Sequence, residues 1–231
     1  MFLEVRSQRR GTMDGLDFPG IVLTRTAEVL VLYSQQPLTV LSSAVVGGGM
    51  VRVHYLLNRH VRRDYNCLDP MADLVAFARN QGISEAFVGQ MTAVSLQKAQ
   101  AVTLRAEALT VAAVVTAGLS NATTPGLSAP VTPGPGTINM ILLIDACLTP
   151  AAMVHAVITA TEVKTQVLMA RGVRTPEGYT ATGTSTDAIA VASTGSGMPL
   201  VYAGPVTLVG WLIGRCVRTA LEEALAQGRT P

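Results

Sequence analysis

The hydrophobic and polar positions of this chain are arranged around one long segment without charge. No Asp, Glu, Lys, Arg or His occurs from Ala108 to Ile144, and two apolar stretches, Val111–Ala117 and Ile138–Ile144, flank loops rich in Gly, Ser, Asn, Thr and Pro. Runs of Val, Ile and Leu of this length are typical of strands buried on both faces. We therefore expect two core strands here, with a polar but uncharged surface in the loops between them.

Further strands are expected nearer the N-terminus. Val29–Tyr33 and Leu38–Val46 are apolar, and the second of them ends at Gly47–Gly49. Consecutive glycines belong where chain or ligand has to approach closely. Val51–Asn58 alternates and predicts a partner strand, and another strand is expected around Ala86–Ala93.

Three segments carry the signals of helix ends. Asp69 is a suitable N-cap, and Gly82 ends the helix that follows it. Thr149 and Gly172 bound a second predicted helix in the same way. A third helix is expected over Pro205–Gln227.

The order of these elements recurs along the chain. Strand, glycine loop, strand, helix and strand occur in the first half and again from Val111 through a strand at 180–192. We interpret this as an internal duplication of a strand-strand-helix-strand unit, although sequence identity between the halves is low. The glycine loops 47–49 and 118–121 would then converge on one seam. The predicted fold class is α/β, a single domain over residues 1–231 with mixed sheets and helices packed outside.

The composition excludes some classes of binding partner and indicates the cellular compartment. A net charge of +2 is too small and too scattered for nucleic-acid binding. The basic segment Arg59–Arg63 can meet phosphate or carboxylate groups, but a solvated loop is the favoured interpretation. Charges at Glu4 and Arg6 argue against a signal peptide, and the uncharged runs are interrupted before the ~20 apolar residues that a membrane helix needs. The three cysteines form no CxxC pair, which favours a reducing compartment. We expect a cytoplasmic protein without nucleic-acid or membrane partners; a homo-oligomer is compatible with the sequence.

General motifs for chemistry are absent. GGGMVRV lacks the Lys-Ser/Thr of a phosphate-binding loop, and no GxSxG occurs. The histidines at 54, 60 and 155 are too scattered for ligand spacing, so no metal site is expected.

The helix predicted after Thr149 has polar residues beside its apolar face. A helical wheel gives a core stripe of Val154, Val157, Ile158, Thr161 and Leu168. His155 and Glu162 lie along one edge of this stripe and Lys164 lies on the other. Glu162 and His155 can form an acid/base pair facing a cleft. The alternative, a solvated polar rim, is favoured by the spacing alone.

The segment TATGTSTDA, residues 180–188, is dense in hydroxyls beside Asp187. A hydroxyl near a carboxylate serves as a nucleophile or holds a water when a base activates it. Equally, such hydroxyls satisfy backbone groups at a bulge or strand edge. Asn121 and Asn139 are compatible with turns or with a site at strand ends. Asp145 is either an acid at a strand end or a cap for the helix that begins near Thr149.

Several of these motifs occur together in a characteristic order. GGG precedes Asn58 and an Asp-Pro helix, and VTAGLSNA, GTIN, ATEVKT and TGTSTDA follow, from about Ser42 to Gly214. With these motifs the sequence resembles the adenosylcobinamide amidohydrolase family of corrinoid salvage. The resemblance implies hydrolysis of the amide that joins the aminopropanol arm to the corrin ring, releasing adenosylcobyric acid and aminopropanol. The cobalt-containing corrinoid is then the substrate, and no resident cofactor is expected.

For this reaction we expect the base to be Glu162 or Asp187, and Thr184, Ser185 or Thr186 to hold or form the nucleophile. The residues expected to bind the substrate are Gly47, Gly48, Gly49, Asn58, Thr116, Gly118, Ser120, Asn121, Asn139, Asp145, Lys164 and Thr182. Two other functions stay open on the sequence alone. One is a non-catalytic corrinoid- or nucleotide-binding module, and the other is a self-cleaving amide hydrolase or acyltransferase with a threonine nucleophile.

Overall fold

The structure, a computed structural model, describes residues 6–7, 16–130 and 136–227 of the chain. Its elements in chain order are β1 (Arg6–Ser7), β2 (Ile21–Arg25), β3 (Val29–Ser42), β4 (Gly49–His60), α1 (Pro70–Asn80), β5 (Phe87–Thr92), a short 3-10 turn (Leu96–Lys98), β6 (Gln100–Ala106), β7 (Leu109–Ala117), β8 (Ala122–Thr123), β9 (Ile138–Ile144), β10 (Cys147–Leu148), α2 (Pro150–Ala170), β11 (Gly183–Thr184), β12 (Ala188–Ser193), β13 (Pro199–Leu200) and α3 (Leu208–Ala226).

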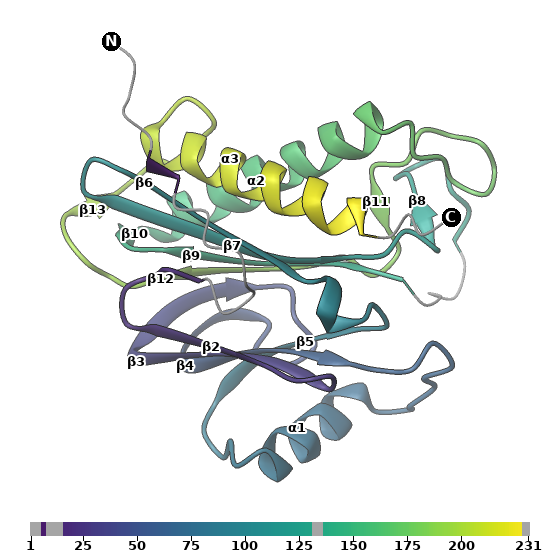
Figure 1. The fold of residues 1–231 in the computed structure, drawn as a ribbon, viewed down its shortest axis with the longest axis horizontal. Helices are drawn as coiled ribbons and strands as arrows, with labels where there is room; N and C mark the ends of the chain where they lie inside the picture. Colours follow the sequence, from purple (N-terminus) through teal and green to yellow (C-terminus); the bar gives the residue numbers. More distant parts are fainter. Residues whose placement is uncertain (1–5, 8–15, 131–135, 228–231) are drawn as a thin grey trace.

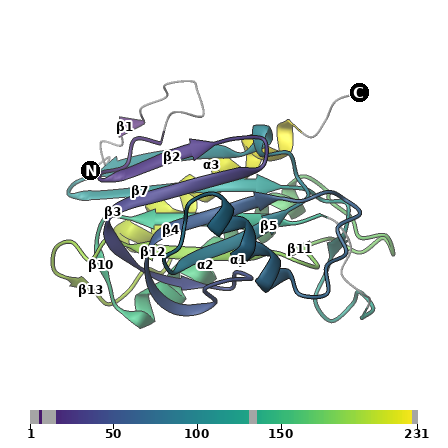
Figure 2. The ribbon, with the colours of Figure 1, turned by 90° about the horizontal axis from the view of Figure 1, so that it is seen from below.

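Within the described residues, nine strands form one mixed sheet that is folded over on itself. Its order is β1-β6-β7-β9-β12-β3-β4-β5, and β2 pairs with β3. Figures 1 and 2 show two stacked strand layers, with α2 and α3 covering one outer face and α1 covering the other. The predicted α/β class with helices packed outside is confirmed.

Strand β3 connects the two layers. Its first part, Val29–Tyr33, pairs with the end of β4, and its second part, Leu38–Ser42, pairs with both β4 and β12. The register shifts between Tyr33 and Leu38, where Pro37 interrupts the ladder. The two strands predicted in this region are therefore one long strand, and its irregular middle lets the sheet turn from one layer into the other.

Alternation along the strands builds three cores. In β9, Ile138, Met140, Leu142 and Ile144 pack toward α2 and α3, whereas Ile141 and Leu143 pack between the strand layers. A third, smaller core lies under α1 and includes Leu74, Ala78 and Phe87. All seven residues of β9 are buried, as the uncharged run predicts.

The predicted recurrence of elements is present in the topology. β3 and β4 are antiparallel, and α1 connects β4 to the parallel strand β5. β7 and β9 are likewise antiparallel, and α2 connects β9 to the parallel strand β12. The two units occupy consecutive parts of the sheet, so the same sequence of strand directions is used twice.

Helix ends follow the predicted signals. The side chain of Asp69 accepts a hydrogen bond from the backbone N–H of Ala72 at 2.9 Å, and Thr149 caps α2 by accepting from Ala152 at 3.2 Å. In the described part of the chain no helix is both long and apolar enough to cross a membrane.

The predicted seam between the glycine loops is not formed. A Cβ on Gly47 would lie 2.6 Å from the carbonyl oxygen of Phe87, at the start of β5, whereas one on Gly118 would lie 2.6 Å from Val94, beyond its end. The two loops therefore lie at opposite ends of β5. Gly47, at φ +72°, permits a close approach of chain to chain.

Candidate functional site

The space between the two strand layers is apolar in its centre and polar at one end, where the C-terminal ends of β4 and β5 meet the N-terminal end of β9. Strand alternation explains the change, because Asn58, Gln90, Thr116 and Asn139 lie two residues from apolar side chains of the interlayer core. All four are at most 4% exposed. We call this end the polar mouth; it lies on the side of β8 and β11 (Figure 1).

Hydrogen bonds connect three of these side chains across the layers. Asn58 Nδ2 donates to Thr116 Oγ1 at 3.0 Å, and Asn139 Nδ2 donates to Asn58 Oδ1 at 2.9 Å and to the carbonyl of Met91 at 2.9 Å. Thr137 Oγ1 lies 3.1 Å from Asn139 Oδ1 and 2.7 Å from the carbonyl oxygen of Thr186, so its single hydrogen is shared between these two acceptors. Asn58 and Thr116 thus hold β4, β7 and β9 together at the inner side of the polar mouth. Asn139 extends this hydrogen-bond network to the surface of the mouth.

Two open cavities adjoin the mouth. The larger, of about 770 Å³, is lined among others by His60, Lys98, Gly118 and Ser120. The smaller, of about 580 Å³, is lined by residues from both layers, including Gln90, Asn139, Thr186 and Asp187. The residues common to both walls are Arg62, Arg63, Ala93 and Gly136. The cavities are therefore neighbours, separated by the segment after β4 and by Gly136.

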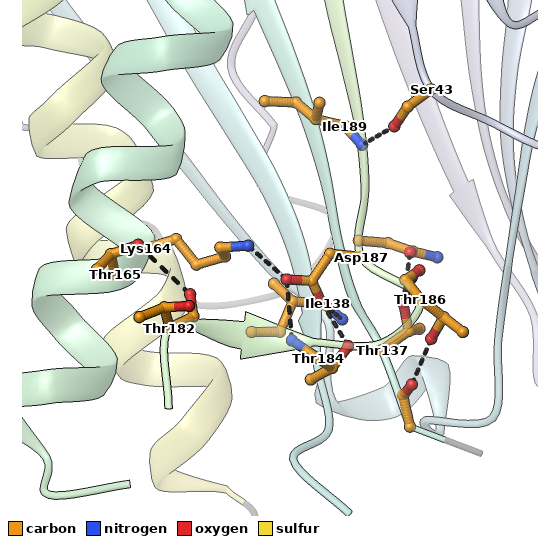
Figure 3. Close-up of polar contacts among 12 residues, drawn as sticks. Ser43, Thr137, Ile138, Lys164, Thr165, Thr182, Thr184, Thr186, Asp187 and Ile189 are labelled. Atoms are coloured by element: carbon orange, nitrogen blue, oxygen red, sulfur yellow. Dashed lines mark hydrogen bonds and ion pairs between the residues drawn. The ribbon is translucent and has the colours of Figure 1, made fainter. Parts of the chain in front are cut away.

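Asp187 is the most completely bonded side chain at this site (Figure 3). Its Oδ1 accepts hydrogen bonds from the backbone N–H of Ile138 at 3.1 Å and from Thr184 Oγ1. Its Oδ2 accepts from the backbone N–H of Thr184 at 3.1 Å and forms an ion pair with Lys164 Nζ. A carboxylate has about four acceptor positions, so Asp187 is saturated by the protein. It anchors the loop before β12 and is poorly suited to the role of base that the sequence suggested.

Lys164 comes to Asp187 from α2. The buried face of α2 includes Ala156, Ala160, Lys164 and Val167, so the lysine stem runs through the apolar face to reach the carboxylate. Gly183 makes room for the pair, because a Cβ there would lie 2.5 Å from Asp187 Oδ2 and 2.8 Å from Lys164 Nζ. Lys164 therefore binds Asp187, where the sequence suggested a substrate contact.

The hydroxyls of residues 184–186 have different surroundings. Thr184 is buried and donates to Asp187. Ser185 is half-buried, and its Oγ accepts a hydrogen bond from Asn121 Nδ2 at 2.7 Å. Thr186 is exposed on the wall of the smaller cavity and donates to the carbonyl of Gly136 at 2.6 Å. Ser185 and Thr186 are thus the two hydroxyls of this loop that do not serve Asp187.

The strand predicted over 180–192 is split into β11 and β12 by this loop. The backbone N–H of Thr182 donates to Thr123 at 3.0 Å, and its carbonyl accepts from Thr165 Oγ1 at 3.4 Å. The split places Ser185 and Thr186 in a turn at the mouth, and Thr182 supports that turn from the side of α2.

The core stripe predicted for α2 is only partly correct: Leu168 is buried and Val157 packs half-buried against the core, but Val154, Ile158 and Thr161 are exposed. Val154 and Ile158 are 49% and 47% exposed, and Glu162 is also exposed. Two residues along a helix correspond to about 200°, so Glu162 lies on the face opposite to Lys164. The structure does not bring Glu162 to Asp187 or to the mouth, and His155 instead stacks on Tyr202 with ring centroids 5.9 Å apart.

Two other expected contacts lie away from the mouth. Asp145 follows the far end of β9 and accepts a hydrogen bond from Thr194 at 2.9 Å; it lies six positions after Asn139, about 20 Å along the strand. Gly47 packs at the start of β5, whereas a Cβ on Gly48 would lie 3.2 Å from the carbonyl oxygen of Ala44 and one on Gly49 would meet nothing within 4 Å. Ser43 and Val45 before them line the smaller cavity. Gly118 lines the larger cavity, but its N–H donates to Thr137 at 2.9 Å and is not available to a ligand.

Comparison with known proteins identifies the family of the chain. The family model described as "Adenosylcobinamide amidohydrolase" matches residues 18–230. The protein of that name from Methanosarcina mazei is 33% identical over 192 residues, which cover 79% of this chain and 88% of that protein. The chain belongs to the adenosylcobinamide amidohydrolase family.

Two further similarities were found. The adenosylcobinamide amidohydrolase of Halobacterium salinarum is 34% identical over 91 residues, covering 39% of this chain and 36% of that protein. The solved structure of a beta-aminopeptidase from Burkholderia sp. is 15% identical with a TM-score of 0.49, covering 96% of this chain and 88% of that one.

In this member of the adenosylcobinamide amidohydrolase family, the segment after β4 contributes residues that sequence reasoning missed. Arg62 and Arg63 were interpreted as a solvated loop, yet they line both cavities, and Tyr65 and Cys67 line the smaller one. The basic charge of Arg59–Arg63 was the signal that the sequence offered, but it did not distinguish a site from a solvated loop. The segment after β4 lines the smaller cavity together with Thr186.

The same segment is held by a polar cluster under α1. Tyr65 donates to Asp73 Oδ2 at 2.6 Å, and Arg59 donates to the same oxygen at 2.8 Å. Burial and the hydrogen bond to Asp73 raise the pKa of Tyr65 above its ordinary value. The hydrogen bond from Tyr65, together with the charge of Arg59, lowers the pKa of Asp73. This cluster fixes the cavity wall to the helix.

Proposed function

We propose that this chain hydrolyses the amide between the aminopropanol arm and the corrin ring of adenosylcobinamide, releasing adenosylcobyric acid and aminopropanol. The observation that carries the proposal is the family match over residues 18–230. The name of the Methanosarcina mazei relative, which covers most of both chains, supports the same reaction. The cobalt belongs to the substrate in this proposal.

The polar mouth provides the reaction site in this proposal. Amide hydrolysis needs an attacking oxygen, a proton acceptor and donors for the developing oxyanion. Thr186 lines the smaller cavity, and Ser185, the residue before it in the turn, accepts a hydrogen bond from Asn121. We place the scissile amide against this turn, with one of these two hydroxyls attacking or holding the attacking water.

Asp187 and Lys164 act as positioning residues in this proposal. The four donors to Asp187 tie the turn to β9 and α2, so the hydroxyls of Ser185 and Thr186 have fixed positions relative to the cavity. Fixed positions matter because a small displacement of a reacting group lowers the rate strongly. Removing Asp187 should therefore reduce turnover through disorder of the turn.

The lining of the smaller cavity suits a neutral ligand that is rich in amides. The outer rim of the cavities is polar. The smaller cavity is lined by the amides Gln90 and Asn139 and by the hydroxyl of Thr137. The peripheral carboxamides of a corrin form hydrogen bonds with such groups without any buried charge. We also propose a cytoplasmic location, in accord with the three free cysteines.

The test is to incubate the purified protein with adenosylcobinamide and to identify the products by mass spectrometry. Formation of adenosylcobyric acid and aminopropanol supports the proposal. Unchanged adenosylcobinamide that co-elutes with the protein identifies a binding module instead. The intact mass of the protein is measured in the same samples, because two fragments divided before a threonine would identify the self-cleaving class.

A further inference from the structure

Gln90 is a buried side chain on the wall of the smaller cavity, and its amide is only partly hydrogen-bonded. It is 1% exposed and projects from β5 on the side of the interlayer core. Nε2 donates to the carbonyl of Met140 at 3.2 Å, which identifies the nitrogen end of the amide. Oε1 has no hydrogen-bond partner among the described residues.

The neighbouring amides differ from Gln90 in this respect. Asn58 Oδ1 accepts a hydrogen bond from Asn139, and Asn139 Oδ1 shares the hydrogen of the Thr137 hydroxyl with the carbonyl of Thr186. Buried acceptors are paired in the great majority of cases, because an unpaired acceptor loses its hydration without compensation. The oxygen of Gln90 is thus suited to a donor that arrives with a ligand, at a cavity large enough to admit one.

We propose that Gln90 Oε1 accepts a hydrogen bond from an –NH2 group of the corrinoid substrate; this inference rests on the proposed function. The acceptor is neutral and is oriented by the bond to Met140, so it selects a neutral N–H donor by geometry. The carboxylate of Asp187, on the same cavity wall, is already occupied by the protein. Two parts of adenosylcobinamide offer the required group: the peripheral carboxamides of the corrin and the amino group of adenine.

The experiment measures the Kd of adenosylcobinamide from the corrin absorbance after rapid mixing, on a time scale shorter than turnover, for the wild type and for Gln90→Met, which keeps the side-chain length but removes the amide. Gln100→Met is the matched control, because Gln100 lies on β6 outside the residues that line both cavities and donates to Lys98 at 3.4 Å. We expect Kd to rise by about tenfold or more in Gln90→Met, since a site built for a polar group loses affinity when the bond is removed. Gln100→Met should stay within about twofold of the wild type.

Methylcobinamide, which lacks the adenosyl group, separates the two sources of the donor. An equal loss of affinity for both corrinoids identifies a corrin carboxamide, and a loss for adenosylcobinamide alone identifies the adenine amine. An unchanged Kd in folded Gln90→Met overturns the inference.

If Gln90→Met does not fold, the substrate is varied against the wild type instead. The probes are a cobinamide whose upper ligand carries purine in place of adenine, so that only the amino group is missing, and an adenosylated corrinoid whose carboxamides are replaced by methyl esters. A loss of affinity of about tenfold for either supports a bound –NH2 group, and no loss for both overturns the inference. Turnover is measured separately: binding without product removes the proposed function and leaves the Kd comparison valid, whereas absence of binding overturns the inference itself.

Discussion

Lys164 and Asp187 form an ion pair that is largely withdrawn from solvent, with side chains 10% and 15% exposed. The pair joins α2 to the turn before β12, so a helix on the outer face of the sheet fixes the hydroxyls at the mouth. Two hydrogen bonds from Thr184 and one from Ile138 complete the environment of the carboxylate. The polar mouth is therefore organised from behind by residues that do not need to contact the substrate.

The first prediction concerns the stability of this ion pair. Lys164→Met should lower the free energy of unfolding by about 3–5 kcal/mol, because it leaves a buried carboxylate without its counter-ion. Chemical denaturation measures the change. Arg62→Met is the control: Arg62 and Asp64 also form an ion pair, but both are exposed, so no measurable change is expected there. Equal stabilities of the two variants would show that the Lys164–Asp187 pair contributes no more than a surface contact.

The second prediction concerns Gly183. Gly183→Ala should destabilise the protein and reduce turnover, because the new Cβ would lie 2.5 Å from Asp187 Oδ2 and 2.8 Å from Lys164 Nζ. Gly204→Ala is the control, since a Cβ there meets nothing within 4 Å. Thermal unfolding and a turnover assay measure both effects. A normal melting temperature and rate in Gly183→Ala would contradict the close packing of the glycine against the pair.

These residues show where sequence reasoning succeeded and where it failed. Asp69, Thr149 and the uncharged strand Ile138–Ile144 were predicted correctly, because caps and continuous apolar runs are local signals. Lys164 and Glu162 were not, since a helical wheel gives the angle between two side chains but does not identify the face that is buried. That choice depends on which strands the helix covers.

Local sequence patterns could likewise not predict which polar residues lie together at the site. Asp145 and Asn139 are both polar residues on or beside β9, but they lie toward opposite ends of the strand. Gln90, by contrast, belongs to no sequence motif. Only the structure shows that its Nε2 donates across the layers to Met140 and that its Oε1 has no hydrogen-bond partner among the described residues. Strand order and layer stacking, which decide both cases, are set by contacts distant in the sequence.

The third prediction is a pH dependence of stability. Because the folded protein lowers the pKa of Asp73, the contribution of this carboxylate is fully present above the unfolded pKa of about 3.9 and is lost as pH falls through the lower folded pKa. Tyr65→Phe removes the hydrogen bond that contributes most to this shift, so stability should fall less steeply below pH 4 than in the wild type. Unfolding curves between pH 6 and pH 3 measure the slopes. Parallel curves would contradict the role of Tyr65.

The fourth prediction concerns which of the two hydroxyls in the turn, that of Ser185 or that of Thr186, takes part in the reaction. Ser185→Ala and Thr186→Val should each lower stability by only about 1 kcal/mol, because each removes one hydrogen bond, with Asn121 or with Gly136, while the bonds between Thr184 and Asp187 remain. The variant that removes the attacking or water-holding hydroxyl should lower kcat by about 10²-fold or more. The other should change KM with little effect on kcat. Single-turnover assays with adenosylcobinamide separate these results.

Two conservative variants distinguish the loss of a reacting hydroxyl from a change in side-chain shape. Ser185→Thr and Thr186→Ser keep a hydroxyl at each position, so they should retain most of the activity lost in the corresponding deletion. Thr184→Val serves as a contrast, because its loss should lower stability and turnover together through the missing bond to Asp187. If both Ser185→Ala and Thr186→Val turn over at the wild-type rate, the attacking oxygen does not come from this turn, and the residues around the larger cavity, His60 first, become the ones to replace.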